Sequence, residues 1–193
     1  SAATREVLAL MGLAWGARLG TYLWRRNWSS PEDWRYAKFR AEWGAQAQFK
    51  MFWFLQFQNV FTLALACSAF LPAAYREGSA PTWALALAVG IWLVAAVGEA
   101  VADAQLRTFK ADPRNRGQVC DVGLWQHSRH PNYFFECVHW LAYVPLAWGS
   151  PLWVWTLIAP VVMWVLILKI SGVPMMEAEM ANRKAVSYTH LTL

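Results

Sequence analysis

The sequence predicts an all-α fold: a polytopic integral membrane bundle of about five transmembrane helices. Hydrophobic residues occupy 58% of the 193 positions and charged residues only 15%, whereas about 25% of the residues in soluble domains are charged. Fourteen tryptophans also favour a bilayer, because their amphipathic rings prefer the depth of the lipid headgroups. The excess of Lys and Arg over Asp and Glu lies in segments beside apolar runs, which indicates membrane topology rather than a nucleic-acid partner.

Five apolar runs approach the roughly 20 residues that a membrane-spanning helix needs. They cover residues 7–24, 49–71, 82–102, 131–149 and 153–170. The segments outside them alternate between rich in Lys and Arg (25–50, 107–129 and 169–184) and poor in them (72–81 and 149–151). Because basic loops stay in the cytoplasm, this alternation predicts five crossings with every basic segment on the cytoplasmic side.

The segment before the second apolar run is more polar and predicts a short interfacial helix. Ser30 and Pro31 favour a helix start, as an N-cap hydroxyl and a proline in the first turn. Tyr36, Phe39 and Trp43 recur at i, i+3 and i+7, with charged residues elsewhere on the helical wheel. Such a helix is expected to lie on the membrane surface.

Arg18 lies within the first apolar run. A charged side chain in a bilayer is costly unless it reaches water or a partner. Two interpretations follow: the side chain extends to the membrane surface, or it is a buried cation that faces a polar cavity. On another face of the same helix, Gly12, Gly16 and Gly20 recur at four-residue spacing and predict the close approach of a second helix.

The polar stretch from Glu99 to Trp140 is the candidate functional region. Glu99 and Asp103 are four residues apart and therefore share one helix face, as do Asn132 and Glu136 on the following helix. The same stretch contains the cations Arg107, Lys110, Arg114, Arg116 and Arg129 and the hydroxyl of Tyr133. Cations bind phosphates, whereas carboxylates and carboxamides bind ribose and base edges, so a phosphate-rich, partly apolar ligand is expected. The alternative is ion pairing between the acids and the cations that follow them at the helix end.

Other ligand classes fit the sequence less well. Only four histidines are present, and His127, His130 and His139 offer too few ligands for a di-iron enzyme, so no metal site is expected. No glycine-rich nucleotide-binding motif occurs and no strands are evident, which excludes soluble nucleotide-binding folds. The three cysteines have neither ligand spacing nor a disulfide pattern.

The chain resembles the DUF1295 membrane proteins, bacterial relatives of steroid 5-alpha-reductases. The resemblance lies in Glu99 and Asp103 followed by QLRTFKADPRNRG (105–117), in DVGLWQHSRHPNYFFE (121–136) and in SGVPMME (171–177). WGARL (15–19) and EDWRYAKFRAEWG (32–44) are similar to that family too. The wider superfamily shares the RHPNY frame with sterol reductases and isoprenylcysteine-type methyltransferases.

The resemblance implies an all-helical membrane fold that holds NADPH at the cytoplasmic side, here of a bacterial inner membrane. In the related reductases, the nucleotide is lined by positions that match Glu99, Asp103, Lys110, Asn132, Glu136 and Trp140. Arg107 and Arg129 match plausible neighbours, and His130 of the RHPNY frame is expected in the same site. The domain is expected to cover residues 1–184, with 185–193 as a non-native or disordered tail. We also expect the chain to lack its N-terminus, because no initiator Met is present.

The chain departs from the family at positions that matter for the site. Phe135 stands where the family usually has Gly and is expected to narrow the cofactor groove. Trp15 falls about where steroid reductases place the Tyr that polarises a ketone, which argues against a 3-keto steroid. We therefore expect Gln58 of the second span, with Gln56 as its competitor, and Tyr133 as catalytic residues.

These features predict an NADPH-dependent membrane reductase of a carbon–carbon double bond in an apolar steroid-, isoprenoid- or lipid-like substrate, such as an enone. Two alternatives stay open: an S-adenosylmethionine-dependent methyltransferase of the isoprenylcysteine type, and a non-enzymatic membrane scaffold. The cations Lys110, Arg114 and Arg116 favour NADPH, because a cationic sulfonium cofactor does not need them. The expected partners are an apolar small molecule and the lipid bilayer.

Cysteine-accessibility labelling tests the predicted topology. A cysteine introduced at Ser79, in a connection poor in basic residues, should react with a membrane-impermeant maleimide added from outside the cell. A cysteine at Gln118 should react only after the membrane is permeabilised, because its segment is rich in Lys and Arg. Labelling of Gln118 in intact cells would refute the topology.

Overall fold

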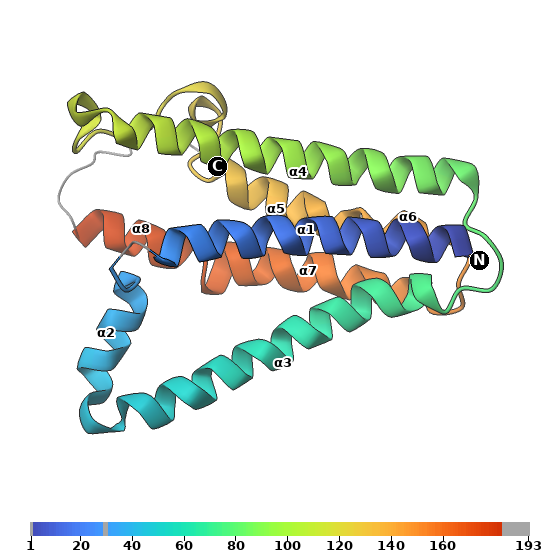
Figure 1. Cartoon of the computed structure of the whole chain (residues 1–193), viewed down its shortest axis with the longest axis horizontal. Coiled ribbons are helices and arrows are strands. Elements are labelled where there is room, and N and C mark those ends of the chain that lie inside the picture. The colour runs from blue at the N-terminus through green and yellow to red at the C-terminus, as the bar shows by residue number, and fades with distance from the viewer. Residues whose placement is uncertain (1, 29–30, 183–193) are drawn as a thin grey trace.

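The computed structural model of the chain is an all-helical bundle elongated along one axis (Figure 1). It describes residues 2–28 and 31–182, a part of the chain that contains no β-strand. Helical passes along this axis are made by α1 (Ala2–Trp28), α3 (Ala47–Ala74), α4 (Thr82–Ala111), α5 (Pro131–Leu141) with α6 (Tyr143–Leu146), and η4 (Trp153–Leu157) with α7 (Ile158–Val165) and η5 (Leu166–Ile170). The predicted all-α bundle is confirmed.

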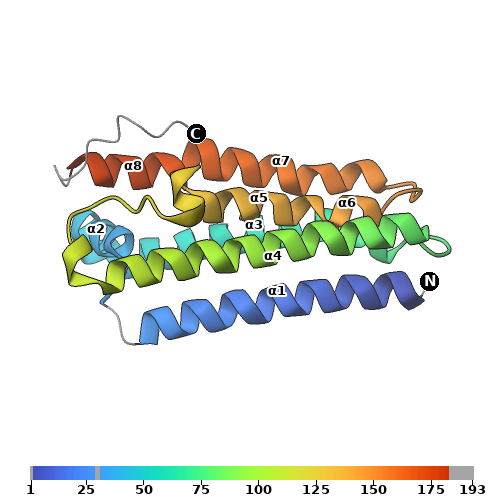
Figure 2. The same cartoon turned by 90° about the horizontal axis from the view of Figure 1, so that it is seen from above.

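The remaining elements lie at the ends of the bundle. One end carries α2 (Trp34–Trp43), the 3₁₀ turn η1 (Gly44–Gln46), the connection from α4 to α5 and α8 (Val173–Asn182), whereas the N-terminus and the connection from α3 to α4 lie at the other (Figures 1 and 2). We call the first the basic end, because it carries the segments rich in Lys and Arg. The chain thus places its basic connections together, as the charge pattern predicted.

Three segments are long and apolar enough to cross a membrane: Arg35–Ala74, Thr82–Ala111 and Trp153–Ala178. They correspond to the second, third and last predicted spans. The first and fourth predicted spans fall on α1 and on the α5–α6 pass, which run alongside α4 in Figure 2 but are not among these three segments. The chain is therefore a membrane protein by the length and composition of its helices.

Proline residues explain where the later helices begin and break. Pro113 forces Asp112 into an extended conformation, with φ −82° and ψ 116°, so α4 ends at Ala111 rather than at the predicted Ala102. Pro145 lacks the N–H that a continuous α5 would need, and the pass divides into α5 and α6. The last pass starts as a 3₁₀ helix before Pro160 and ends as the π-helix η5.

A helix, α2, forms in this segment, but it begins later than predicted. Asp33 is its N-cap, because the carboxylate accepts a hydrogen bond from the Arg35 N–H at 3.1 Å. The expected start at Ser30 and Pro31 is wrong, since Pro31 precedes the helix. The predicted aromatic face is confirmed: Phe39 and Trp43 pack around the Phe54 ring of α3, and so does Tyr36.

The N-terminal half of α1 is held against the bundle at the end opposite the basic end. The Thr4 hydroxyl accepts a hydrogen bond from the Ala80 N–H at 3.0 Å, and the Arg5 Nε donates to the Ala74 carbonyl at 2.9 Å. Of the three spaced glycines, Gly12 faces the Phe70 ring, where a Cβ would lie 3.6 Å from it. The expectation for the other two is wrong, because no described atom lies within 4 Å of a Cβ at either position.

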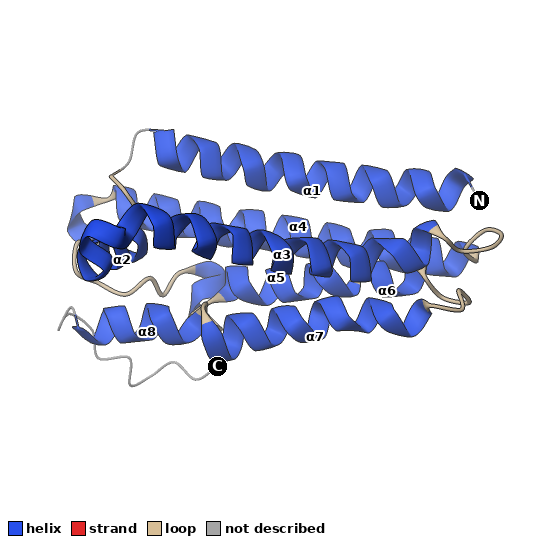
Figure 3. Ribbon diagram, turned by 90° about the horizontal axis from the view of Figure 1, so that it is seen from below, coloured by secondary structure: helices blue, strands red, loops and turns tan. Residues whose placement is uncertain are grey.

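Toward the basic end, α3 leans away from the other helices (Figure 1). Seen from below, it lies in front of α4 and α5 (Figure 3). Its middle turns expose large apolar side chains, among them Phe57 (63%), Val60 (64%) and Leu63 (65%). Such exposure is stable in a bilayer, where lipid chains cover apolar side chains.

A close contact joins α4 and α5 at Gly98 and Phe135. A Cβ at Gly98 would overlap the Phe135 ring, so the ring occupies the space that the glycine leaves open. The missing side chain on α4 therefore allows a bulky one on α5. This pair fixes how α4 and α5, the two helices that carry the predicted site residues, are aligned along the bundle axis.

Substituting Gly98 by Ala should lower the free energy of unfolding by about 1–3 kcal/mol, because the added methyl group overpacks the seam. Thermal unfolding of the purified protein in detergent measures this effect. Gly90→Ala is the matched control, because it lies on the same helix with no described atom within 4 Å of its Cβ. Equal unfolding temperatures for the two variants would contradict the close contact.

Candidate functional site

The GLW segment after α4 is anchored on that helix by side chains. Gly123 has φ 58°, and a Cβ there would overlap the Gln105 side chain. The absence of a Cβ lets the Gln105 Oε1 accept a hydrogen bond from the Leu124 N–H at 2.9 Å. The buried Trp125 indole donates to the Ala102 carbonyl at 2.9 Å. The motif therefore positions the connection against α4.

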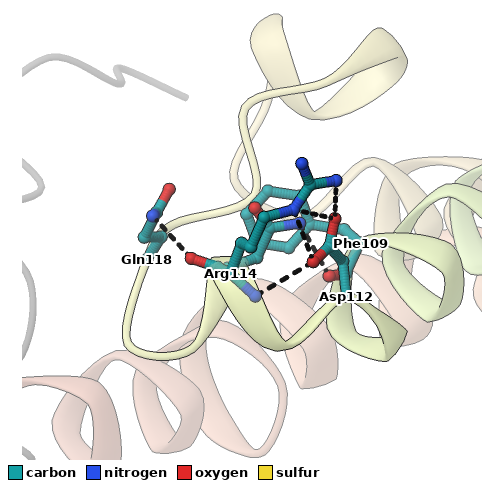
Figure 4. A network of polar contacts seen from close by, with 5 residues as sticks. Phe109, Asp112, Arg114 and Gln118 are labelled. Atoms are coloured by element: carbon teal, nitrogen blue, oxygen red, sulfur yellow. Dashed lines mark hydrogen bonds and ion pairs between the residues drawn. The ribbon is translucent and has the colours of Figure 1, made fainter.

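The segment that directly follows α4 is a compact turn (Figure 4). The Asp112 carboxylate accepts hydrogen bonds from the Arg114 backbone N–H at 2.9 Å and from the guanidinium Nη2 at 2.6 Å. The Gln118 side chain donates to the Arg114 carbonyl, and Asn115 donates to the Phe109 carbonyl, each at 2.9 Å. The hydrogen bonds from Arg114 lower the pKa of Asp112 below its ordinary 3.8. The turn is thus held by a local ion pair.

The SRHPNY segment starts α5 and places two rings together. The Ser128 hydroxyl accepts from the His130 N–H at 3.2 Å, and Pro131 occupies the first turn of the helix. The His130 ring stacks on Tyr133 with centroids 5.4 Å apart. Burial lowers the pKa of His130 below its ordinary 6.5, an effect that Glu177 opposes. The imidazole is therefore neutral at pH 7.

The SGVPMME segment closes over this region from the far end of the chain. Gly172 lies so near the Ile167 backbone that a Cβ would approach its carbonyl oxygen to 2.6 Å. This close packing forms the turn between η5 and α8. There, Glu177 forms an ion pair with the Arg129 Nη1 at 3.0 Å. The segment is thereby tied to the start of α5.

A cavity of about 610 Å³ lies between the end of α4, the following turn, the start of α5 and α8. We call it the loop cavity. Six of the predicted site residues line it: Lys110, Arg116, Arg129, His130, Asn132 and Tyr133. Trp125 and Met176 complete its wall from the GLW and SGVPMME segments. The structure thus brings residues from three predicted motifs around one space.

A second group of predicted residues forms a polar cluster inside the bundle instead. Arg18 of α1 is partly buried and forms an ion pair with Glu99 of α4, so its side chain finds a partner within the bundle. The Trp140 indole donates to Glu136 at 3.1 Å. Ion pairing suits this position, because an apolar bundle strengthens charge interactions.

Asp103 joins this interior cluster to the loop cavity. Its carboxylate lies 3.5 Å from the Asn132 amide nitrogen, a long hydrogen bond between α4 and α5. Asn132 itself lines the loop cavity. An acid inside the bundle thereby orients an amide at the cavity wall.

Sequence reasoning did not select His139 and Tyr143 for this cluster. The Tyr143 hydroxyl lies 3.0 Å from the His139 Nε2, and both side chains are buried. The His139 ring stacks on Trp15 with centroids 4.9 Å apart. The four-residue spacing of His139 and Tyr143 was a usable signal, because such residues share a helix face.

Several predicted site residues lie elsewhere. Gln58 is exposed on the middle of α3 and does not line the loop cavity. The Arg114 side chain is 89% exposed and bound to Asp112, and the exposed Arg107 does not line the loop cavity either. Phe135 packs on Gly98 and does not line the loop cavity. Among the described residues, no three His, Cys, Asp or Glu side chains gather as metal ligands would.

The fold and the site define a membrane protein of the all-helical class, with a cation-lined cavity at one end of its bundle. The family model described as "Protein of unknown function (DUF1295)" matches residues 1–192, and the chain belongs to the DUF1295 family. Neither the curated proteins nor the solved structures contain a significant match to it. The segment 185–193, predicted to be a non-native or disordered tail, lies outside the described residues, and the family match includes most of it.

Asp112→Asn should loosen the turn after α4, because the ion pair with Arg114 is lost. In the parent protein the same loss should occur on acidification: the pKa of the folded carboxyl is lowered, so its contribution is complete above the ordinary 3.8 and disappears as the pH falls through the folded value. Hydrogen exchange of the Asn115 and Gln118 amides measures both effects. Exchange in the variant that matches the parent at pH 7 would show that the ion pair does not hold the turn.

Proposed function

We propose that this protein is an NADPH-dependent membrane reductase that reduces a carbon–carbon double bond conjugated to a carbonyl in an apolar substrate. The observation that supports it is the loop cavity, which combines cations with amide and hydroxyl groups at the edge of a membrane bundle. An enone gains a hydride and a proton in this reaction, while NADPH is oxidised to NADP⁺.

The residues of the loop cavity fit the nucleotide. Its volume of about 610 Å³ lies within the range of about 300–1,000 Å³ that cofactor pockets occupy. Lys110 from the end of α4 and Arg116 from the following turn would hold the phosphates, since both side chains are exposed to the cavity region and cationic. Asn132, which Asp103 orients, would bind a ribose or amide group.

Other cavity residues have partners that limit their role. Arg129 is engaged by Glu177, so it would close the wall rather than serve as the main phosphate ligand. His130 adds no positive charge at pH 7, because burial lowers its pKa, so it is not a phosphate ligand. Arg114 lies outside the set, because its guanidinium binds Asp112. The phosphate site therefore rests on Lys110 and Arg116.

NADPH, when bound, supplies the hydride for the β-carbon of the enone. The Tyr133 hydroxyl would donate a hydrogen bond to the carbonyl oxygen, where negative charge grows during the reaction. Its ring is held by stacking on His130, so the hydroxyl is oriented before a substrate arrives. Gln58 has no place in this mechanism, since it lies on the exposed middle of α3. We further propose that the basic end faces the cytoplasm of a bacterial inner membrane.

Titration of the purified protein with NADPH, NADH and S-adenosylmethionine tests the assignment. We expect NADPH to bind more tightly than NADH, because its extra phosphate meets a cation. Loss of one charged contact costs about 1.5–3 kcal/mol, so the Lys110→Ala, Arg116→Ala double variant should lose the NADPH preference by at least about tenfold. Isothermal titration calorimetry provides the dissociation constants.

Arg114→Ala is the matched control, because it removes a cation of the same connection that does not line the cavity. Its affinity for NADPH should match that of the parent. Preferential binding of S-adenosylmethionine would favour the methyltransferase alternative and overturn the reductase proposal. Binding of none of the three cofactors would favour a scaffold.

A further inference from the structure

A second cavity of about 460 Å³ lies on the other side of His130 and Tyr133 from the loop cavity. These two stacked rings belong to the walls of both cavities. Apart from His127, Ser128 and the shared pair, the second cavity is lined by apolar side chains, among them Phe134, Trp164 and Leu168. We call it the apolar cavity.

The apolar side chains that line the apolar cavity suit contact with lipid. Phe134 is 58% exposed, Trp164 46% and Leu168 39%, and the last two belong to a segment apolar enough to cross a membrane. A molecule can therefore enter from the bilayer without crossing an aqueous phase.

The lining changes from polar to apolar along α5. His127, Ser128 and His130 lie at the basic end, where α5 begins, whereas Phe134 and Cys137 follow further along the helix. This order matches a membrane amphiphile, whose polar group lies at the interface and whose chain points into the bilayer.

A buried histidine lies at the polar end of the cavity. His130 is 6% exposed, and its Nε2 makes no hydrogen bond to any residue that the structure describes; Glu177 lies 3.9 Å from it. Besides His130, the residues His127, Ser128 and Tyr133 give this end of the cavity its polar side chains. A carbonyl or hydroxyl group that reaches this end would meet hydrogen-bonding partners, which the apolar remainder of the cavity lacks.

The π-helix η5 shapes the opposite wall. The Ser171 N–H donates to the Leu166 carbonyl at 2.8 Å across this wide turn, from which Leu168 lines the cavity. π-Helical turns are rare and occur frequently at functional sites. Gly172 permits the turn, because a side chain there would meet the Ile167 backbone.

The geometry points to the apolar cavity as the binding site for the substrate, a single-chain amphiphile that enters from the bilayer, places its carbonyl at His130 and extends its chain along α5. Calling this molecule the substrate rests on the proposed reductase function. The proposal that an amphiphile binds in the cavity does not depend on that function. Because Tyr133 and His130 separate the two cavities, the carbonyl end of such a molecule lies next to the loop cavity.

Photo-crosslinking in lipid nanodiscs, without cofactor, tests this site. The probe is a long-chain alkenone that carries a diazirine on its chain, and peptide mass spectrometry locates the label. We expect labelling to concentrate on residues 124–137 and 164–173 and to be displaced by the unlabelled alkenone but not by phosphatidylcholine. Labelling spread evenly over lipid-facing residues, including Val60 and Leu63 of α3, would overturn the proposal.

Leu168→Trp should abolish the displaceable label, because the larger ring fills the cavity. Val161→Trp is the matched control, since this residue is 60% exposed on α7 and does not line the cavity. His130→Phe keeps an aromatic ring against Tyr133, removes the nitrogen and should weaken displacement by roughly three- to tenfold. Unchanged labelling in both the Leu168 and the His130 variants would also overturn the proposal.

The two proposals fail separately. Loss of the cavity label with intact NADPH binding overturns the amphiphile site alone. A displaceable label in a protein that does not bind NADPH overturns the reductase assignment and leaves the amphiphile site in place.

Discussion

The close approach of α4 and α5 determines where the polar groups of this protein lie. Gly98 allows the Phe135 ring into the seam, and the two helices meet at one depth as a result. Nearer the basic end of the same seam, Asp103 reaches Asn132. Two residues further along α4, Gln105 holds the GLW segment. Without this approach, Asp103 would lose its partner on α5, and a charge without a partner is unstable near lipid.

Much of the fold could be predicted from the sequence, because its main signals are local. Apolar runs near 20 residues mark the helical passes, and the alternation of basic connections places them at one end. Boundaries were less predictable. The start of α2 depends on which of several polar residues caps it, and Asp33 rather than Ser30 does so. The predicted end of α4 at Ala102 is too early. Polar residues follow this position, but they continue the helix until Pro113 ends it.

The candidate site could be predicted only in part, because spacing reveals which residues share a face but not which helix lies opposite. Lys110, Asn132 and Tyr133 do line one cavity. Glu99 and Glu136 share the predicted faces with them, yet they face Arg18 and Trp140 inside the bundle. Arg18 is distant from both in the sequence, so no local pattern could assign its partner. In contrast, the binding of Arg114 to Asp112 is a local turn interaction that the sequence could have indicated.

The segment Ser171–Glu177 borders both cavities, and this position affects how they bind molecules. Val173 lines the apolar cavity, Met176 lines the loop cavity, and Glu177 binds Arg129 at the wall of the latter. One short piece of chain therefore borders two compartments. A molecule bound in either cavity would therefore contact the same piece of chain. The two binding free energies would be coupled through that contact, without movement of the transmembrane helices.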